Sequence, residues 1–327
     1  MRLIPTSTHI IPVHPATDGW DVQKLAVEKH EFPSPATSHQ KIAFLFSHSN
    51  GFHKEAYHPL IRRFKDQLRS LKEYDHTDIH IIAWDSRFHG DSARLNQGEF
   101  MPTYRWLDNA LDAKQVIDKL ELKQNYDQFI GVGHSFGATS MALLESFYPH
   151  TFDALCLLEP VLKNEFIPTK IRETSDVYAS RTRRDEWPNR EECQKFLLKR
   201  PFWRQFHPEA LENYVNYGMY DTDQGTIKLK CPKEHEALIF SNANAEGFIT
   251  YNTMKTLEIP THCTFAFDSF MFDVNLTESL IQSNPKNITI ECIKGGHMVP
   301  CGNPDSIIPQ IMKLIERLNR IKQASKL

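Results

Sequence analysis

A regular alternation of short apolar runs with segments of helical period constrains the fold of this chain more than any other feature of its sequence. Apolar runs of strand length lie at 42–46, 79–84, 128–133, 154–158, 261–267 and 288–293. Segments with the apolar spacing of a helix lie at 59–71, 107–120, 136–147, 277–283 and 309–321. Two shorter strand-like runs, at 10–13 and 23–28, precede them. We therefore expect an α/β fold with a mostly parallel eight-stranded sheet that is flanked by helices.

The alternation stops between residues 161 and 257. This stretch is rich in Arg, Glu and aromatic residues and has no run that predicts a buried strand; its prolines lie at 168, 188, 201, 208 and 232. The length of 327 residues permits two domains in series. One sheet with a single insertion explains the order of the elements better. We expect an α/β core at 1–160 and 258–327 and a helical cap at 161–257.

Composition excludes several classes of protein. The chain has 38 Lys and Arg against 41 Asp and Glu, a net charge of −3, so it lacks the positive field that favours nucleic-acid binding. Its longest apolar runs are far shorter than the roughly 18 residues that cross a bilayer, and we expect no membrane span. The first residues lack the apolar stretch of a secretory signal. The six cysteines lack C-x-x-C spacing, which favours free thiols over disulfides.

The last three residues, Ser325, Lys326 and Leu327, match the tripeptide that addresses proteins to the peroxisome. A receptor reads this signal at the carboxyl end of a chain, so we expect the peroxisomal import receptor as a partner and the peroxisome matrix as the location. A chance ending on a basic tail is the alternative. The sequence leaves the formation of a homo-oligomer open.

The strongest chemical signal is G-H-S-F-G at 133–137, placed directly between a predicted strand and a predicted helix. In a G-x-S-x-G sequence at this position the serine occupies a sharp turn, and the two glycines leave room for the neighbouring backbone. The positive end of the following helix points toward the negative charge that develops in acyl transfer. We predict that Ser135 is a catalytic nucleophile.

A serine nucleophile needs a base and an acid that orients the base. His297, in the loop after the last predicted strand, is expected at the same edge of the sheet as Ser135 and is our candidate base. For the acid we favour Asp268, which ends a strand between the serine and the histidine. Asp273 in the same loop and Glu159 after another strand are the alternatives. The glycine that is usual two or three residues before such an acid is absent here.

Acyl transfer also needs backbone N–H groups that stabilise the oxyanion. One donor should be Phe136, the residue after the nucleophile. The other should come from the loop H-S-N-G-F-H at 48–53, where Gly51 permits a turn with positive φ. We expect the backbone N–H of Phe52, or else of Gly51, to serve there. The alternative interpretation is that this loop is an ordinary Asn-Gly turn.

The ordered set of these motifs resembles the α/β-hydrolase fold superfamily over essentially the whole chain. The motifs in this set are the loop at 48–53, the loop D-S-R-F-H-G-D-S at 85–92, the nucleophile turn at 133–137 and G-G-H-M-V-P at 295–300. The loop H-S-N-G-F-H-K at 48–54 and a cap containing S-R, W-P and R-E-E at 180–181, 187–188 and 190–192 resemble fungal peroxisomal serine hydrolases more narrowly. Those relatives are described as peroxisomal lipases or as similar to toxin-biosynthesis proteins.

The resemblance implies a carboxylic-ester hydrolase of the esterase or lipase type that uses no metal and no organic cofactor. Its substrate would be a small-molecule ester or acyl thioester with an apolar acyl part. A carbon–carbon bond hydrolase on the same fold and a non-catalytic binding protein that kept the fold are the rival hypotheses, because the fold alone does not choose the chemistry.

Basic residues gather in the predicted cap at 170, 172, 181, 183 and 184, among acidic residues at 173, 185, 186, 191 and 192. Such clusters are usually solvated helix faces, and we favour that interpretation. A phosphate site for a coenzyme A thioester is the alternative. Cap aromatic residues, at 187, 202, 203, 206, 214 and 217, are expected to pack the cap on the core, and some of them to line an acyl pocket.

Overall fold

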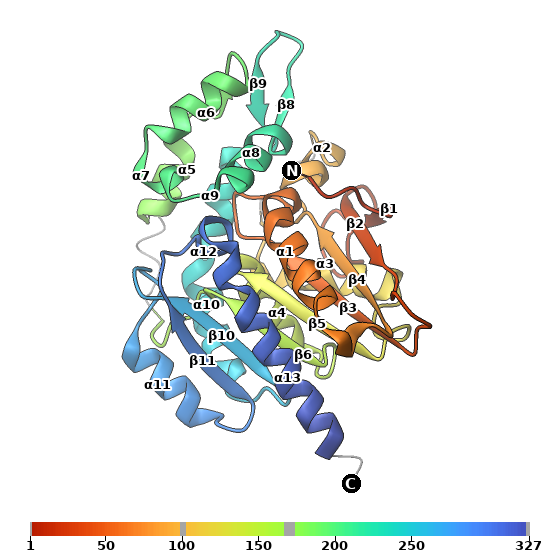
Figure 1. Cartoon of the computed structure of the whole chain (residues 1–327). Helices are drawn as coiled ribbons and strands as arrows, with labels where there is room; N and C mark the ends of the chain where they lie inside the picture. The colour runs from red at the N-terminus through yellow and green to blue at the C-terminus, as the bar shows by residue number, and fades with distance from the viewer. Residues whose placement is uncertain (1, 99–102, 167–173, 325–327) are drawn as a thin grey trace.

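An eight-stranded sheet lies at the centre of the protein in the computed structural model, which describes residues 2–98, 103–166 and 174–324 (Figure 1). The strands follow the spatial order β1-β2-β4-β3-β5-β6-β10-β11. Their bounds are β1 Ser7–Pro12, β2 Lys24–Phe32, β3 Gln40–Ser47, β4 Thr77–Trp84, β5 Gln128–His134, β6 Ala154–Leu158, β10 Thr261–Ala266 and β11 Ile288–Ile293. β2 runs antiparallel to both of its neighbours, β1 and β4, and every other pair of adjacent strands in this sheet is parallel. The predicted fold class is therefore confirmed.

Different helices cover the two faces of the sheet, because successive side chains of a strand point to opposite faces. Ile42, Phe44 and Phe46 of β3 belong to one apolar core with α1 and α13. Ala43 and Leu45 belong to a second core with α3, α4, α10 and α11. The bounds are α1 His58–Arg69, α3 Trp106–Lys119, α4 Phe136–Phe147, α10 Ala243–Met254, α11 Val274–Ser283 and α13 Ile308–Ala324.

The segment between β6 and β10 contains the stretch that we expected to form the cap. Its helices before α10 are α5 Ser175–Thr182, α6 Arg190–Leu198, α7 Pro201–Arg204, α8 Pro208–Tyr217 and α9 Lys233–Ser241. Three short strands, β7 Glu186–Trp187, β8 Met219–Asp221 and β9 Ile227–Leu229, form a small antiparallel sheet that the sequence did not indicate. α10 returns to the core and packs on α4 and α3.

The carboxyl ends of the parallel strands meet at one edge of the sheet, and α5, α6, α7 and α8 of the expected cap lie beyond this edge toward the top of Figure 1. Ser135 follows β5 directly and Glu159 follows β6, its neighbour in the sheet. The shorter helical elements are α2 Gly90–Leu95, α12 Val299–Gly302 and the 3-10 turns Lys54–Tyr57, Lys72–Tyr74 and Pro304–Ser306. Loops from distant parts of the chain are thereby brought together under the cap.

Other expectations concern the chain as a whole. Within the described ranges, no helix is both long enough and apolar enough to cross a bilayer. All six cysteines are free thiols, as the sequence predicts. The predicted targeting tripeptide, Ser325, Lys326 and Leu327, lies outside the residues that the structure describes.

Candidate active site

Ser135 lies at a strained turn between β5 and α4. Its backbone has φ 53° and ψ −117°, a conformation that non-glycine residues rarely adopt. The flanking glycines are required by close backbone contacts: a Cβ atom on Gly137 would lie 2.6 Å from the carbonyl oxygen of His48, and one on Gly133 would lie 2.6 Å from Cα of Ala138. The structure thus supplies the steric reason for both glycines of the motif.

A row of hydrogen bonds runs from Ser135 through His297 to Glu159. The Oγ atom of Ser135 lies 2.9 Å from Nε2 of His297, and Nδ1 of His297 lies 2.9 Å from Oε2 of Glu159. A carboxylate only accepts hydrogen bonds, so Nδ1 carries the ring proton and Nε2 is left to accept from the serine hydroxyl. The Glu159 side chain is fully buried, whereas 14% of the His297 side chain is exposed.

The position of the acid corrects the expectation from the sequence. No hydrogen bond or ion pair joins Asp268 to His297: Asp268 lies in an exposed stretch after β10, and its backbone N–H donates to the carbonyl of Gly295 at 2.9 Å. Asp273 caps α11 by accepting from the backbone N–H of Leu276 at 3.0 Å. Glu159 occupies the position beside His297 because β6, which it ends, is the neighbour of the strand that carries the nucleophile.

Glu159 is held by further hydrogen bonds. Its carboxylate accepts from the backbone N–H of Ala266 and from the hydroxyl of Ser269, in addition to His297. Its own backbone N–H donates to the carbonyl of Thr264 at 2.7 Å, and its φ of 52° aims the side chain across the end of β10. Three donors on one buried carboxylate fix its orientation.

The loop after β3 also differs from expectation. The backbone N–H of Phe52 donates to the carbonyl of Ser49 at 3.2 Å, and that of Gly51 donates to Nε2 of His89 at 3.0 Å. Both predicted donors are therefore engaged, and Phe52 is corrected as an oxyanion donor. The backbone N–H of Asn50 has no acceptor among the described residues, and Asn50 lines the cavity beside Ser135, so this group is our candidate for an oxyanion donor.

Two N–H groups thus remain beside the nucleophile. Phe136 is the first residue of α4, where a helix leaves its backbone N–H without an internal partner. Asn50, Phe136 and Ser135 line the same cavity. The side chain of Asn50 steadies the loop by donating from Nδ2 to the carbonyl of Glu236 at 3.0 Å. The sequence signal for Asn50 was present, because this residue directly precedes the glycine that turns the loop.

His134 supports the base from behind. Its Nε2 donates to the carbonyl of His297 at 2.8 Å, and its Nδ1 accepts from the hydroxyl of Tyr57 at 2.5 Å. The Tyr57 oxygen in turn accepts from the backbone N–H of Ser49 at 3.1 Å. Burial lowers the pKa of His134 well below its usual range, which keeps this ring neutral. No motif in the sequence predicted this support, because it joins residues that are far apart in the chain.

A cavity of about 290 Å³ adjoins Ser135 and His297 and is lined mainly by apolar side chains. The apolar walls come from both the core and the cap, and they include Trp106, Phe202, Trp203, Phe240, Phe270 and Met271. The polar part of the wall contains an ion pair in which Arg183 Nη1 lies 2.9 Å from Glu236 Oε2. This cavity can hold an apolar acyl group next to the serine hydroxyl.

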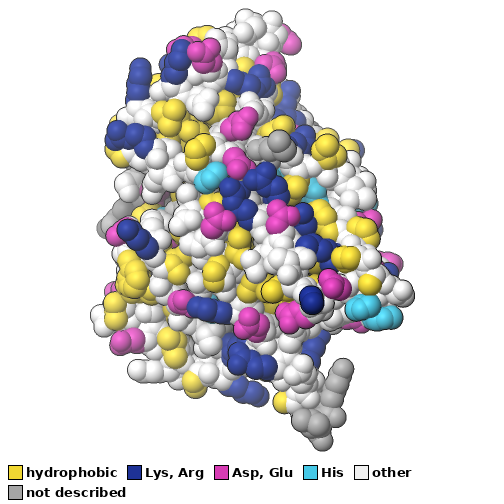
Figure 2. Space-filling model, viewed as in Figure 1, with side chains coloured by type: hydrophobic (Ala, Val, Ile, Leu, Met, Phe, Trp, Pro, Cys, Tyr) yellow, Lys and Arg dark blue, Asp and Glu magenta, His cyan; other side chains and the backbone are white. Residues whose placement is uncertain are grey.

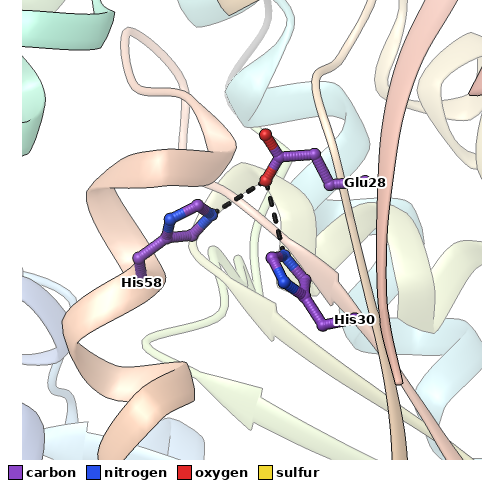
Figure 3. A group of neighbouring side chains, drawn as sticks. All are labelled: Glu28, His30 and His58. Atoms are coloured by element: carbon purple, nitrogen blue, oxygen red, sulfur yellow. Dashed lines mark hydrogen bonds and ion pairs between the residues drawn. The ribbon is translucent and has the colours of Figure 1, made fainter. Parts of the chain in front are cut away.

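Glu28, His30 and His58 form a separate buried cluster that does not line this cavity (Figure 3). Their candidate ligand atoms lie within 4.8 Å of one another, close enough to share a metal ion. However, the backbone N–H of Leu3 donates to Nδ1 of His58 at 3.0 Å, so the ring proton is on Nε2 and points at Glu28. A metal at Nε2 would need that nitrogen unprotonated. We therefore interpret the cluster as an anchor for the N-terminal segment.

Residues 44–253 match the profile of the family described as the alpha/beta hydrolase family. A curated relative, the Type I acyl-CoA thioesterase mpaH of Penicillium roqueforti, is 27% identical over 273 residues, which cover 73% of this chain and 59% of that protein. The chain spans about half the length of the curated relatives it matches.

Two solved structures extend the likeness over nearly the whole chain. The peroxisomal alpha-beta-hydrolase Lpx1 from Saccharomyces cerevisiae superposes with a TM-score of 0.77 and 20% identity, over 96% of this chain and 86% of that one. E-2-(acetamidomethylene)succinate hydrolase superposes with a TM-score of 0.70 and 16% identity, over 95% of this chain and 99% of that one. At these identities the likeness concerns the fold.

Proposed function

Because the chain belongs to the alpha/beta hydrolase family, we propose that it hydrolyses a carboxylic ester or thioester through an acyl-enzyme on Ser135. The observation that carries this proposal is the row of two 2.9 Å hydrogen bonds from Ser135 through His297 to Glu159. A serine hydroxyl is a weak nucleophile unless an adjacent base removes its proton, and a buried carboxylate on the far side of the base fixes the ring for that transfer.

In the first half of the reaction, Oγ of Ser135 attacks the acyl carbon while its proton moves to Nε2 of His297. The backbone N–H groups of Asn50 and Phe136 stabilise the negative oxygen of the tetrahedral intermediate. Glu159 stabilises the positive charge on the imidazole. The intermediate then collapses, the bond to the leaving group breaks, and Nε2 returns the proton to the departing alcohol or thiol.

In the second half, a water molecule replaces the leaving group. Nε2 of His297 takes a proton from this water as its oxygen attacks the acyl carbon of the acyl-enzyme. The second tetrahedral intermediate collapses, the carboxylic acid departs, and the proton returns to Oγ of Ser135. The balance is one ester or thioester and one water consumed for one acid and one alcohol or thiol.

A thioester is the better supported of the two substrates. The curated relatives that match this chain carry the name acyl-CoA thioesterase at 27–29% identity. The apolar cavity beside Ser135, about 290 Å³ in volume, suits an apolar acyl group of either kind of substrate. Phe270 and Met271 from the loop after β10 and Trp203 from the cap would contact that group.

A substrate panel on the purified full chain tests this proposal. We expect hydrolysis of p-nitrophenyl esters and of acyl-coenzyme A thioesters that carry the same acyl groups. Ser135→Ala should lower kcat by a factor of about 10³ or more, with an unchanged circular dichroism spectrum. Ser146→Ala is the matched control, because its hydroxyl donates only to the carbonyl of Ala142 in the same helix. Full activity in Ser135→Ala would overturn the proposal.

We also propose the peroxisome matrix as the location and the peroxisomal import receptor as a partner. Support comes from the terminal tripeptide Ser325, Lys326 and Leu327 and from the structural likeness to a peroxisomal hydrolase. A fluorescent protein fused in front of the chain should enter peroxisomes. The same fusion without the last three residues should stay outside them, and import of the shortened fusion would contradict this assignment.

A further inference from the structure

A second cavity adjoins the one beside Ser135. This groove in the cap has a volume of about 620 Å³, and it shares several wall residues with the catalytic cavity, among them Arg183, Trp203 and Tyr214. A ligand seated on Ser135 can therefore continue past Arg183 into the cap. The groove is more than twice as large as the catalytic cavity, so it has room for a substantial second part of the substrate.

Two cations of the groove lie close to the same aromatic ring. The guanidinium carbon of Arg184 lies 5.3 Å from the ring centre of Phe196, and that of Arg200 lies 3.9 Å from the same centre. Both arginines donate to backbone carbonyls, Arg184 to Glu186 at 2.7 Å and Arg200 to Phe196 at 3.4 Å. Among the described residues, neither guanidinium pairs with a carboxylate.

Some other cations of the cap are neutralised by acidic partners. Arg190 lies 2.7 Å from Asp221, and Lys195 lies 2.8 Å from Glu191. Lys and Arg side chains are prominent over α6 and α7 at the upper left of Figure 2. Arg184 and Arg200 both line the groove and both lack a carboxylate partner among the described residues, so they are free to receive an anionic ligand.

A third arginine stands between the two cavities. Arg183 is paired with Glu236 through Nη1, but its Nε and Nη2 atoms are buried and have no hydrogen-bond partner in the described part of the chain. Buried donors without partners are costly unless a ligand satisfies them. Arg183 also lines both cavities, so these unsatisfied donors lie on the residue that a polar chain crossing from one cavity to the other would pass.

We propose that the cap groove binds the phosphate-bearing end of a coenzyme A thioester, with Arg184 and Arg200 on the phosphates. This inference rests on the proposed hydrolase function and assigns the leaving group of its substrate. Planar guanidinium groups match phosphate oxygens in a bidentate way. The acyl part occupies the cavity at Ser135, and the amide-containing linker passes Arg183.

This assignment revises our interpretation of the cap charges as a solvated face. Of the basic residues singled out in the sequence, Lys170 and Arg172 lie outside the described residues, and the groove uses Arg183 and Arg184. Arg200, which follows α6, was not among them. The rival occupant is the far end of a long acyl chain that carries a carboxylate.

Kinetics with matched substrates test the assignment. Octanoyl-coenzyme A and octanoyl-pantetheine share the acyl group and the thioester but differ in the phosphates and the nucleotide. For an R184Q/R200Q double variant we expect KM for octanoyl-coenzyme A to rise by about tenfold or more, with KM for octanoyl-pantetheine and for p-nitrophenyl octanoate within about twofold of the unmodified protein. Arg204→Gln is the control, because this exposed arginine of α7 lines neither cavity.

Direct binding separates the groove from catalysis. Calorimetry of the Ser135→Ala protein should show coenzyme A binding more tightly than pantetheine, and R184Q/R200Q in that background should abolish the difference. Equal binding of the two thiols, or equal KM changes for all three substrates, would overturn the phosphate site. If R184Q/R200Q raised KM only for ω-carboxyacyl substrates, the groove would be assigned to the acyl chain instead. Undiminished hydrolysis by Ser135→Ala would instead contradict the proposed function, whatever the groove binds.

Discussion

Glu159→Gln tests the assignment of the orienting acid most sharply. The substitution keeps the size of the side chain and removes its charge. The carboxylate accepts from three donors, the backbone N–H of Ala266, the hydroxyl of Ser269 and Nδ1 of His297. A glutamine offers one acceptor oxygen and turns an NH₂ group toward the remaining donors. The substitution therefore disturbs both the orientation and the charge stabilisation of His297.

Two magnitudes follow from these contacts. Loss of the charge that stabilises the imidazolium should lower kcat by a factor of about 10³ to 10⁴, or about 4 to 5 kcal/mol of barrier. The mismatched amide at a fully buried position should lower the free energy of unfolding by about 1 to 3 kcal/mol. The second effect is small enough for a folded protein to be assayed, which makes the first effect measurable.

The assay compares Glu159 with Asp268, the acid that we favoured from the sequence. Steady-state hydrolysis of octanoyl-coenzyme A and p-nitrophenyl octanoate is measured for Glu159→Gln and Asp268→Asn, with urea unfolding of each variant. Asp268→Asn should keep kcat within about twofold, because its exposed side chain makes no described hydrogen bond. A fall of more than about a hundredfold in Asp268→Asn, with Glu159→Gln near full activity, would refute the reasoning.

Three further outcomes follow from the geometry. Gly137→Ala places a Cβ atom 2.6 Å from backbone oxygen and should cost about 3 kcal/mol or more in urea unfolding, whereas Gly225→Ala, with no atom within 4 Å, should cost about 1 kcal/mol for its positive φ. Asn50→Ala removes the side-chain bond that steadies the proposed oxyanion loop and should lower kcat about tenfold; an effect on KM alone would contradict that role. Burial lowers the pKa of His48 to about 3, so the unfolded chain binds a proton that the folded one does not. Stability should therefore fall below about pH 6.5, by about 3 kcal/mol at pH 4, and the unfolding free energy of His48→Gln should depend less on pH.

The sheet was predictable because its signal is local. Each parallel strand is a short apolar run, and successive residues such as Phe44 and Leu45 point to opposite faces, so both faces of the strand are buried. The meeting of Ser135 and His297 was also predictable, since both follow parallel strands and such strands end at one edge. For these features, local pattern and topology suffice.

The acid and the oxyanion loop were not decided by local pattern. Glu159 and Asp268 both follow strands, and both lie between Ser135 and His297 in the sequence. Only the side-chain hydrogen bonds show which of the two carboxylates faces His297. The missing glycine before Asp268 was the one warning in the sequence. In the loop after β3, the choice of donor depends on hydrogen bonds that engage Gly51 and Phe52, one of them to a histidine 38 residues away.

The most direct measurement of the central proposal is covalent labelling of the native chain with a fluorophosphonate. Such a probe reacts with a serine that a neighbouring base activates. Peptide mass spectrometry should find one adduct, on Ser135, and hydrolysis of p-nitrophenyl octanoate should disappear in step with labelling. Ser135→Ala should stay unlabelled. A chain that hydrolyses the ester while Ser135 remains unlabelled at full probe exposure would contradict a serine acyl-enzyme.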